Sequence, residues 1–443
     1  MKNLINKIKE NIEGTAFENK SFIAAGFVRD MVMSKVSHDI DIVVELPEGG
    51  IRLAEFLTKK LNGTDVVIFE RFGTAKIVLD GHDVEFVMSR KEDYRENDRK
   101  CDVSFGTIED DVRRRDFTIN SMLFDISNSE IIDILNGKSD IKNKILRTTS
   151  EPDTIFREDP LRMLRAIRFA SRLGFTIEDN TFESIKRNSD MIKTISNERI
   201  KDEFMKILSD NNFVTALDML IETDLMDNIG LPELKQCIGV EQNKFHKHDV
   251  FNHIIDVMCE TENNSLCRLA SLLHDIGKPE KRTIDEEGLV HFYEHELKSF
   301  DIADNFMRKL KFSNDEIILV TSAVKNHMKF CQNISNRTIR KMRRELGDVV
   351  FDFSVKIALA DRKSHLDFDS TLFERIDKIM LEIPVNVTNV PINGKMLMEK
   401  FNLKPSKMIG KLIEFELSVI EEFPDISEEE LFDKIELYFN QKF

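Results

Sequence analysis

The chain has no tryptophan, only 3 tyrosines and only 5 cysteines among its 443 residues. The cysteines form no C-x-x-C pair and no regular spacing, which excludes a disulfide-stapled scaffold and favours a reducing compartment. No apolar run approaches the roughly 20 residues that cross a bilayer. Residues 1–10 have the polarity of a short amphipathic helix and lack the apolar core of a signal peptide. These absences predict a cytoplasmic protein without a membrane partner.

Basic charge is also in deficit. Acidic residues (80) outnumber basic residues (64), and the formal net charge of −16 argues against general affinity for nucleic acid. Basic residues nevertheless gather between residues 90 and 172, while residues 414–433 are markedly acidic. Because a basic surface on an acidic body still attracts phosphates locally, the net charge does not exclude an RNA partner.

Two aspartates one residue apart, Asp39 and Asp41, are the most informative feature of the chain. They alternate with Ile40 and Ile42 as in a β-strand, so we expect both carboxylates on one face and the isoleucines in a core. Adjacent carboxylates suit Mg²⁺, which leaves its other positions to water and phosphates, and two such ions can stabilise a phosphoryl transfer. An isolated D-x-D is also compatible with a polar strand edge, so the neighbouring motifs decide.

A glycine turn precedes the two aspartates. The apolar run at residues 22–26 ends at Gly26, and Arg29 and Asp30 then begin a helical stretch. A strand, a glycine turn and a helix N-terminus together favour a triphosphate, because free N–H groups and the helix dipole attract anions. Arg29 and Asp30 are equally compatible with a surface ion pair.

A second charged motif, Glu158–Arg162, lies in the helical region. Asp159 before Pro160 predicts a helix N-cap, and Gly174 predicts the end of the same helix. Since Arg162 follows Asp159 by three residues, an acceptor and a donor can project together from one side of the helix. A basic stripe continues along this helix at Arg165, Arg168 and Arg172.

With these motifs in this order, the chain resembles the class II tRNA nucleotidyltransferases (CCA-adding enzymes) and the related bacterial poly(A) polymerases. Both are polymerase β-type nucleotidyltransferases. The matching segments are Ala25–Asp30 for G-G-x-V-R-D, Asp39–Asp41 for D-x-D, Arg71–Thr74 and Val84–Arg90 for the next two strands, Arg114–Asn120 for R-R-D-F-T-x-N, Glu158–Arg162 for E-D-x-x-R and Asn197–Ile200 for the neck motif. Ala25 departs from the family pattern, which has glycine there.

The resemblance implies roles for the matching residues. Asp39 and Asp41 would bind Mg²⁺ as catalytic residues, with Glu85 as a third carboxylate and Asp83 as the competing choice on the same strand. Asp116 and Asn120 would hold the sugar, and Asp159 with Arg162 would select the base. The implied nucleotide-binding set is Gly26, Arg29, Arg115, Asp116, Asn120, Asp159, Arg162, Arg165 and Arg168.

Two further segments leave alternatives open. Arg113–Arg115 place positive charge near the catalytic strand, unless they form a solvated helix face. Residues 91–100 are polar without an apolar period and predict a mobile loop. In the family, a loop at this place is needed to switch from C to A addition, so its presence favours complete CCA addition.

A separate group of histidines follows, with eight of the ten between residues 246 and 365. Residues 266–275 predict a buried helix that ends with His274 and Asp275. Mixed imidazole and carboxylate ligands suit a water-activating metal. The series resembles the HD phosphohydrolase superfamily, which implies a fused HD domain with a second divalent metal of unknown identity. The implied ligands are His253, His274, Asp275, His295, His327 and Asp361, with His246 and His248 either accessory or on the surface.

The apolar periodicity predicts an α+β fold, in which a polymerase β-type head with a small mixed sheet is followed by helices only. We predict five segments. They are a nucleotidyltransferase head at 1–135, a base-selecting neck at 136–205, linking body helices at 206–240, an HD metal-binding domain at 241–365 and a helical tail at 366–443.

The resemblance implies template-independent, Mg²⁺-dependent addition of CCA to tRNA 3′ ends from CTP and ATP. The HD domain would add a metal-dependent phosphohydrolase activity. Three alternatives stay open: a poly(A) polymerase, a CC-only or A-only tRNA nucleotidyltransferase, and a protein that is chiefly an HD phosphohydrolase. The sequence does not indicate the oligomeric state.

Overall fold

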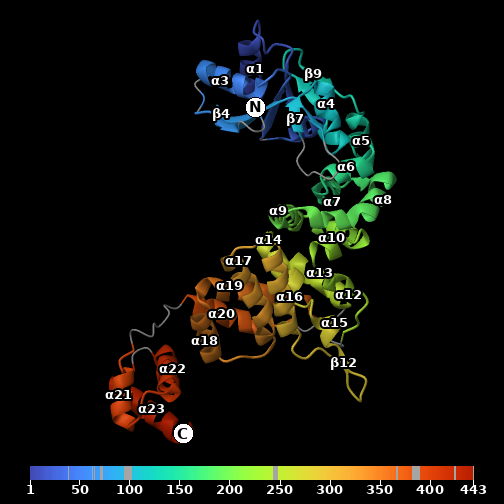
Figure 1. Cartoon of the computed structure of the whole chain (residues 1–443). Helices are drawn as coiled ribbons and strands as arrows, with labels where there is room; N and C mark the ends of the chain where they lie inside the picture. Colours follow the sequence, from blue (N-terminus) through green and yellow to red (C-terminus); the bar gives the residue numbers. More distant parts are fainter. Residues whose placement is uncertain are drawn as a thin grey trace. The chain divides into compact units, whose positions relative to one another are not determined.

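The structure is a computed structural model (Figure 1). It describes residues 1–37, 39–61, 63, 65–69, 73–93, 102–242, 248–365, 368–381, 390–423 and 426–442. The predicted residues Arg71 and Phe72, most of the loop at 91–100, and His246 lie outside these ranges. Two compact units, residues 1–232 and 233–443, are described separately here. The five finer segments stay predictions.

The first unit contains a mixed sheet of seven strands in the order β3-β4-β5-β2-β1-β8-β9, in which β2 and β5 run parallel and the other neighbours run antiparallel. The strands are β1 (Ser21–Ala24), β2 (Ile40–Val44), β3 (Val67–Phe69), β4 (Thr74–Leu79), β5 (His82–Met88), β8 (Leu123–Asp125) and β9 (Glu130–Ile132). Helices α1 (Lys2–Ile12) and α3 (Gly49–Leu61) share a hydrophobic core with one face of this sheet.

Alternation along the strands assigns side chains to the two faces. Ile40 and Ile42 are buried in the α1–α3 core. Val43 belongs to a second buried cluster on the opposite face, together with residues of α4 (Ile108–Arg113). Since Asp41 shares the parity of Val43, its carboxylate lies on the α4 face of the sheet, as the alternation predicted.

Residues 91–93 differ from the predicted loop at 91–100. Together with Arg90 they form β6 (Arg90–Asp93), which pairs antiparallel with β7 (Asp102–Phe105) as a separate two-stranded sheet. No apolar period marks this strand because it carries charged groups: Glu92 forms an ion pair with Arg90 (2.8 Å) and another with Arg114 (3.3 Å).

Helices then dominate the first unit. They are α2 (Gly26–Val32), α5 (Gly137–Asn143), α6 (Pro152–Glu158), α7 (Leu161–Leu173), α8 (Asp179–Asn188), α9 (Asn197–Leu208), α10 (Phe213–Glu222) and α11 (Leu225–Ile229). Gly174 ends α7 with a left-handed backbone (φ 67°), as predicted. Asp159 caps α7 from one residue further out than predicted, since its Oδ1 accepts from the N–H of Leu161 (3.2 Å) while the residue also ends α6.

The second unit is almost entirely helical. Its helices are α12 (Glu233–Gln236), α13 (Val250–Glu260), α14 (Ser265–Leu273), α15 (Lys278–Lys281), α16 (His295–Lys309), α17 (Asn314–Asn326), α18 (Asn336–Leu346), α19 (Asp348–Ser364), α20 (Thr371–Met380), α21 (Gly394–Phe401), α22 (Lys407–Glu422) and α23 (Glu428–Lys442). A short hairpin of β12 (Thr283–Ile284) and β13 (Val290–His291) interrupts them. The predicted α+β class is therefore confirmed. In the described ranges, no helix has both the length and the apolar character that crossing a bilayer requires.

Candidate active site and metal centre

Three carboxylates gather where β2 lies between β1 and β5. Asp41 is in register with Ala24 on β1 and with Glu85 on β5. Asp83, the competing choice, lies two residues earlier on β5, where it is exposed and forms an ion pair with Lys76 (2.8 Å). The register therefore favours Glu85 over Asp83 as the neighbour of Asp41.

The electrostatics of these carboxylates suit a cation. Burial, followed by the negative charge of Glu85, raises the pKa of Asp41 to about 6, although Arg115 opposes the shift. A bound cation would relieve this repulsion, and hard oxygen ligands suit Mg²⁺. Their oxygens are more widely spread than a preformed site requires: among described residues, Asp39, Asp41 and Glu85 are not a group whose ligand atoms all lie within 4.8 Å.

A cavity of about 430 Å³ lies in the same unit. All nine residues that were predicted to bind the nucleotide line it. The full lining is Ala25, Gly26, Arg29, Arg114, Arg115, Asp116, Asn120, Asp159, Arg162, Arg165, Arg168, Phe169 and Arg172. Seven arginines against two aspartates make the cavity strongly cationic, as a polyphosphate requires.

The turn between β1 and α2 differs from the prediction in one respect. Gly26 is the first residue of α2, and the residue with the left-handed backbone is Ala25 (φ 56°, ψ −130°). A side chain is strained in this region, whereas glycine is not. Arg29 of α2 forms the ion pair with Asp30 (2.8 Å) that was the alternative prediction, although its side chain is buried, and its Nη1 also donates to Oδ1 of Asn120 (2.9 Å).

Two buried carboxylates accept hydrogen bonds from arginines that line the cavity and so hold these side chains in place. Asp116 accepts from Nε and Nη2 of Arg165 (2.9 and 2.6 Å) and from Nδ2 of Asn120 (3.2 Å). Asp111, within α4, accepts from Arg114 and Arg115. Burial alone would raise the pKa of each carboxyl, but the neighbouring guanidinium groups hold both pKa values below the ordinary range.

The two predicted roles of residues 113–115, a solvated helix face and positive charge near the catalytic strand, both occur, but in different residues. Arg113 exposes 54% of its side chain and pairs with Glu109 on the same helix, so it belongs to a solvated face. Arg114 and Arg115 turn to the cavity. Asp111 was not predicted as a site residue, although its position three and four residues before the two arginines is a recognisable helical signal.

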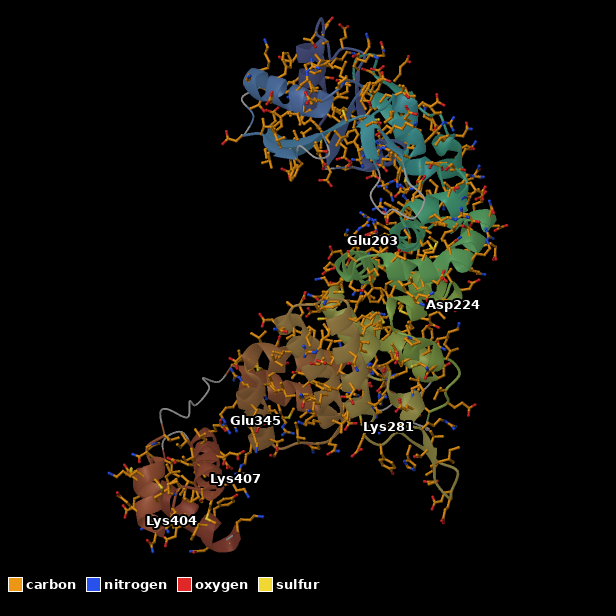
Figure 2. All side chains as sticks on the ribbon, in the orientation of Figure 1. Glu203, Asp224, Lys281, Glu345, Lys404 and Lys407 are labelled. Atoms are coloured by element: carbon orange, nitrogen blue, oxygen red, sulfur yellow. The ribbon has the colours of Figure 1, made fainter. Side chains whose placement is uncertain are left out.

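Phe169 lines the cavity and was not indicated by the sequence. Its ring lies 4.3 Å from the Arg168 guanidinium carbon, with those of Arg165 at 5.3 Å and Arg29 at 5.5 Å. Glu203 on α9, labelled in Figure 2, accepts from Nε of Arg168 (2.7 Å). An aromatic ring with several cations around it stabilises the cationic wall before any ligand arrives.

The predicted base-selecting pair also lies on the cavity wall. Nη1 of Arg162 donates to Glu158 (2.8 Å), and its Nη2 donates to the carbonyl of Arg114 (2.9 Å). Asp159 accepts from Arg199 of the neck motif (2.7 Å). Both side chains are thus fixed by neighbours, which limits their rotation and suits a rigid template edge.

Comparison with known proteins agrees with this geometry. The model of the poly A polymerase head domain matches residues 21–147, the "Probable RNA and SrmB- binding site of polymerase A" matches residues 174–238, and tRNA nucleotidyltransferase domain 2 matches residues 293–423. A CCA-adding enzyme of Lactobacillus helveticus is 35% identical over 52% of this chain and 56% of its own length. Another, from Ligilactobacillus salivarius, is 29% identical over 92% of this chain and 89% of its own length. The chain belongs to the class II tRNA nucleotidyltransferase family.

Other members of the family extend the comparison. An A-adding tRNA nucleotidyltransferase of Deinococcus radiodurans is 28% identical over 69% of this chain and 74% of its own length. The solved structure of the Bacillus stearothermophilus CCA-adding enzyme in complex with CTP aligns with a TM-score of 0.69 at 20% identity, covering 99% of this chain and 98% of that chain. At 20% identity, this alignment shows that the two chains share a fold.

This tRNA nucleotidyltransferase also contains a buried histidine–aspartate centre in its second unit, made of the six predicted ligands. Two groups have ligand atoms within 4.8 Å of one another. They are His253, His274 and Asp361, and Asp275, His295 and His327. None of the six exposes more than 4% of its side chain. They come from α13, the α14–α15 turn, α16, the end of α17 and α19, so helix packing brings together what the sequence separates.

Local geometry positions the central aspartate. His274 ends α14, and Asp275 begins the turn to α15. A Cβ on Gly277 would lie 2.7 Å from the backbone N of Ser299 and 2.8 Å from the carbonyl O of His295. Only glycine allows this turn to approach α16 so closely, and that approach brings His295 to Asp275.

Of the accessory histidines, His248 is exposed and lies 3.6 Å from Asp256, so it belongs to the surface. His365, which was not predicted, lies 3.3 Å from Oδ1 of Asp361 on α19. Its position one helical turn after Asp361 is the signal that sequence inspection could have used. The assignment of this centre to an HD domain stays a prediction.

Proposed function

We propose that this protein adds C, C and A to the 3′ end of tRNA, using CTP and ATP and no nucleic-acid template. The observation that supports it is the cationic cavity, where all nine predicted nucleotide-binding residues come together from the head and the neck segment. Relatives that bear the name CCA-adding enzyme align over most of the chain. The partners would therefore be tRNA, CTP and ATP.

In this proposal Asp39, Asp41 and Glu85 bind Mg²⁺. When bound there, Mg²⁺ would lower the pKa of the terminal RNA hydroxyl and offset the charge of the triphosphate. Asp41 lies beside the β1–α2 turn, so its carboxylate points to the side where Arg29 would contact phosphate. Asn120, held between Arg29 and Asp116, would accept or donate at the ribose.

Asp159 and Arg162 would select the base. A carboxylate accepts from a base amino group, and a guanidinium donates to ring nitrogen or carbonyl groups, so the pair can imitate a complementary base. Replacing Arg162 by Lys retains the charge but removes the planar fork. We expect this variant to lose discrimination between CTP, ATP, GTP and UTP more than it loses overall rate.

The test uses full-length protein with three tRNA transcripts, ending before CCA, after C, and after CC. Labelled CTP and ATP are supplied separately and together. We expect C from CTP on the first two, A from ATP on the third, and a stop after the third nucleotide when both are present. A long A tail would contradict the proposal in favour of a poly(A) polymerase. Because one relative is an A-adding enzyme, a second outcome also matters. Incorporation only on transcripts that end in CC would identify an A-only enzyme.

We also propose that the histidine–aspartate centre binds a divalent metal and hydrolyses phosphoesters. The residues fit a metal, because Nε2 of His274 and Oδ1 of Asp275 are buried without a hydrogen bond within the described part of the chain. Such atoms normally have a partner. A metal there would activate water at a pH near neutrality.

The test for this second activity measures release of p-nitrophenol from bis-p-nitrophenyl phosphate and of phosphate from a 2′,3′-cyclic nucleotide, with Mn²⁺, Co²⁺, Ni²⁺ or Mg²⁺. His274→Gln should abolish it, whereas Asp39→Asn should leave it intact. Absence of hydrolysis with all four ions, in protein that retains bound metal, would contradict the activity and leave the metal site standing.

A further inference from the structure

The sheet face that carries the catalytic carboxylates is covered by helix on one side only. One row of paired residues crosses this face, namely Ala24 on β1, Asp41 on β2, Glu85 on β5, Lys76 on β4 and Val67 on β3. Ala24 is buried in the cluster with α4, whereas Glu85, Lys76 and Val67 are exposed. The described part of the chain therefore leaves the β5–β4–β3 side of this face open to solvent.

The open side ends in an apolar edge strand. β3 is the outermost strand beside β4, and its residues Val67 and Phe69 are 55% and 50% exposed. Phe69 is in register with Thr74, which is paired with Val87, and Val87 packs against the cluster that contains α4 residues. By the alternation of the strands, Phe69 and Val67 thus project from the carboxylate face. Exposed apolar groups on an edge strand favour association and mark a contact surface.

Lys76 lies between the carboxylates and the apolar edge. It is the only lysine or arginine within the described spans of β3, β4 and β5. Its ammonium lies 2.8 Å from the carboxylate of Asp83, with the two side chains 46% and 56% exposed. Because an exposed pair of this kind contributes little stability, the lysine can exchange its partner for a phosphate at small cost.

The chemistry of phosphoryl transfer indicates which reactant approaches over the open side. The attacking and leaving oxygens lie roughly in line on opposite sides of the phosphorus. The triphosphate is proposed to lie toward the β1–α2 turn, where Gly26 and Arg29 line the cationic cavity. The attacking RNA hydroxyl must then reach Asp41 from the direction of Glu85, and the open side begins at Glu85.

We propose that Val67, Phe69 and Lys76 form an RNA platform that holds the terminal nucleotides of the acceptor RNA. Phe69 and Val67 stack against a terminal base, and Lys76 contacts the neighbouring phosphate. Lys76 and Val67 lie two and three strand spacings of about 4.8 Å from Asp41, a distance that the last nucleotides of an RNA can cover. The inference rests on the proposed nucleotide addition and specifies how its RNA end is positioned.

An apolar platform suits a substrate whose last base changes during the reaction. In the proposed reaction the RNA ends first in the base that precedes CCA, then in C, then in CC. Stacking on an aromatic ring tolerates every base, because each base presents a π face. Hydrogen bonds to base edges would instead fit one end and reject the others. The three platform residues bind RNA and take no part in the proton or phosphoryl transfer.

Steady-state kinetics of the full-length chain separates the RNA from the nucleotide. With a transcript that ends in CC, Phe69→Ala should raise the KM for RNA about ten-fold and leave the KM for ATP within about two-fold. Phe69→Tyr retains a ring and should restore the KM for RNA. Lys76→Ala should raise the KM for RNA about three-fold, and Lys76→Arg should restore it.

Two exposed residues of the same unit provide matched controls. Ile134 is an apolar residue that is 38% exposed and lies outside the platform. Lys7 on α1 pairs with Asp80, as Lys76 pairs with Asp83, but α1 packs on the opposite face of the sheet. Ile134→Ala and Lys7→Ala should leave both KM values unchanged. Circular dichroism of every variant establishes that it is folded.

Photochemical crosslinking tests the contact without catalysis. A transcript that lacks CCA and carries 4-thiouridine as its last nucleotide is irradiated with Asp39→Asn/Asp41→Asn protein, which is expected not to extend it. Mass spectrometry should locate the adduct in the peptide that contains Val67 and Phe69, and adding Phe69→Ala should lower its yield. An adduct found only in other peptides would overturn the platform.

The outcomes separate the platform from the proposed function. If the unaltered protein incorporates neither CTP nor ATP but still forms the adduct at Phe69, nucleotide addition fails and the platform stands. If incorporation is normal and neither Phe69→Ala nor Lys76→Ala raises the KM for RNA, only the platform is overturned. Equal rises in the KM for RNA and for ATP would also overturn it. A dimer in analytical ultracentrifugation that Phe69→Ala abolishes, with an unchanged KM for RNA, would instead identify the strand as an interface between copies.

Discussion

In the cationic cavity of the first unit, carboxylates hold the buried sides of arginines, whereas in the histidine–aspartate centre they lie among histidines. Asp111, Asp116 and Glu203 neutralise the buried sides of the guanidinium groups, and the cavity of about 430 Å³ stays cationic at its front. Asp275 and Asp361 face imidazole Nε2 atoms in a closed interior. The first arrangement suits a large anion that enters and leaves, and the second suits small cations that remain bound.

The largest effect should come from removing the head carboxylates. Asp39→Asn together with Asp41→Asn should lower CTP and ATP incorporation by about three orders of magnitude or more, because two hard ligands are lost at once. Measured in the same preparation, phosphoester hydrolysis and metal content of the histidine–aspartate centre should not change. Retained incorporation would refute the assignment of Asp39 and Asp41.

Asp111→Ala should show how strongly the cavity depends on its buried supports. It removes the charge partner of Arg115 and one of the two charge partners of Arg114, which keeps Glu92, and breaking a buried pair typically costs about 3–5 kcal/mol of unfolding free energy. Glu109→Ala removes the partner of the exposed Arg113 and should cost less than about 0.5 kcal/mol. Urea unfolding of both variants measures the difference. Equal effects would show that Asp111 is not an electrostatic support.

A third prediction concerns pH. Because burial and Glu85 raise the pKa of Asp41 to about 6, that carboxyl binds a proton more tightly in the folded protein than in the unfolded chain. Lowering the pH from 7 through 6 should therefore stabilise the metal-free protein and weaken Mg²⁺ binding over the same range.

Glu85→Gln removes a negative charge next to Asp41 and should shift the midpoint of Mg²⁺ binding to lower pH. Asp83→Asn is the matched control on the same strand and should leave the midpoint unchanged, since Asp83 is exposed and pairs with Lys76. Calorimetric titration across pH 5–8 measures both. A shift with Asp83→Asn alone would reverse the ranking of the two acidic residues.

The smallest expected effect is at Ala25. Glycine tolerates its backbone conformation, and the relief of strain is partly offset by the greater freedom of glycine in the unfolded chain. Ala25→Gly should therefore stabilise the protein by about 0.5–1 kcal/mol, seen as a higher melting temperature. Destabilisation would mean that the methyl group contributes packing that outweighs the strain.

Sequence periodicity and motif order correctly predicted the features of the fold and of the candidate site that depend on local sequence pattern. Alternation placed Ile40 and Ile42 in the core and Asp41 on the opposite face, and the charged motifs identified the cavity lining. Phe169 and Glu203 could not be predicted from the sequence, because they contact the cavity arginines only when α7 packs against α9. The β6–β7 pairing was missed for a related reason, since its charged residues make ion pairs that no apolar period reveals.

The histidine–aspartate centre was predictable as a set but not as an arrangement. The resemblance implied six ligands, yet the two different environments of the Asp275 oxygens depend on where α13, α16 and α17 meet. The left-handed backbone at Ala25 was not predictable either, because alanine gives no sequence signal for that conformation.

Because the six ligands are drawn from α13, the α14–α15 turn, α16, the end of α17 and α19, any ion bound there joins segments that are up to about a hundred residues apart in the chain. Binding free energy then becomes folding free energy for residues 233–443 alone. Chelator should lower the melting temperature of residues 233–443 and leave that of residues 1–232 unchanged. The metal supply would then determine how long residues 233–443 stay folded beside the nucleotidyltransferase unit.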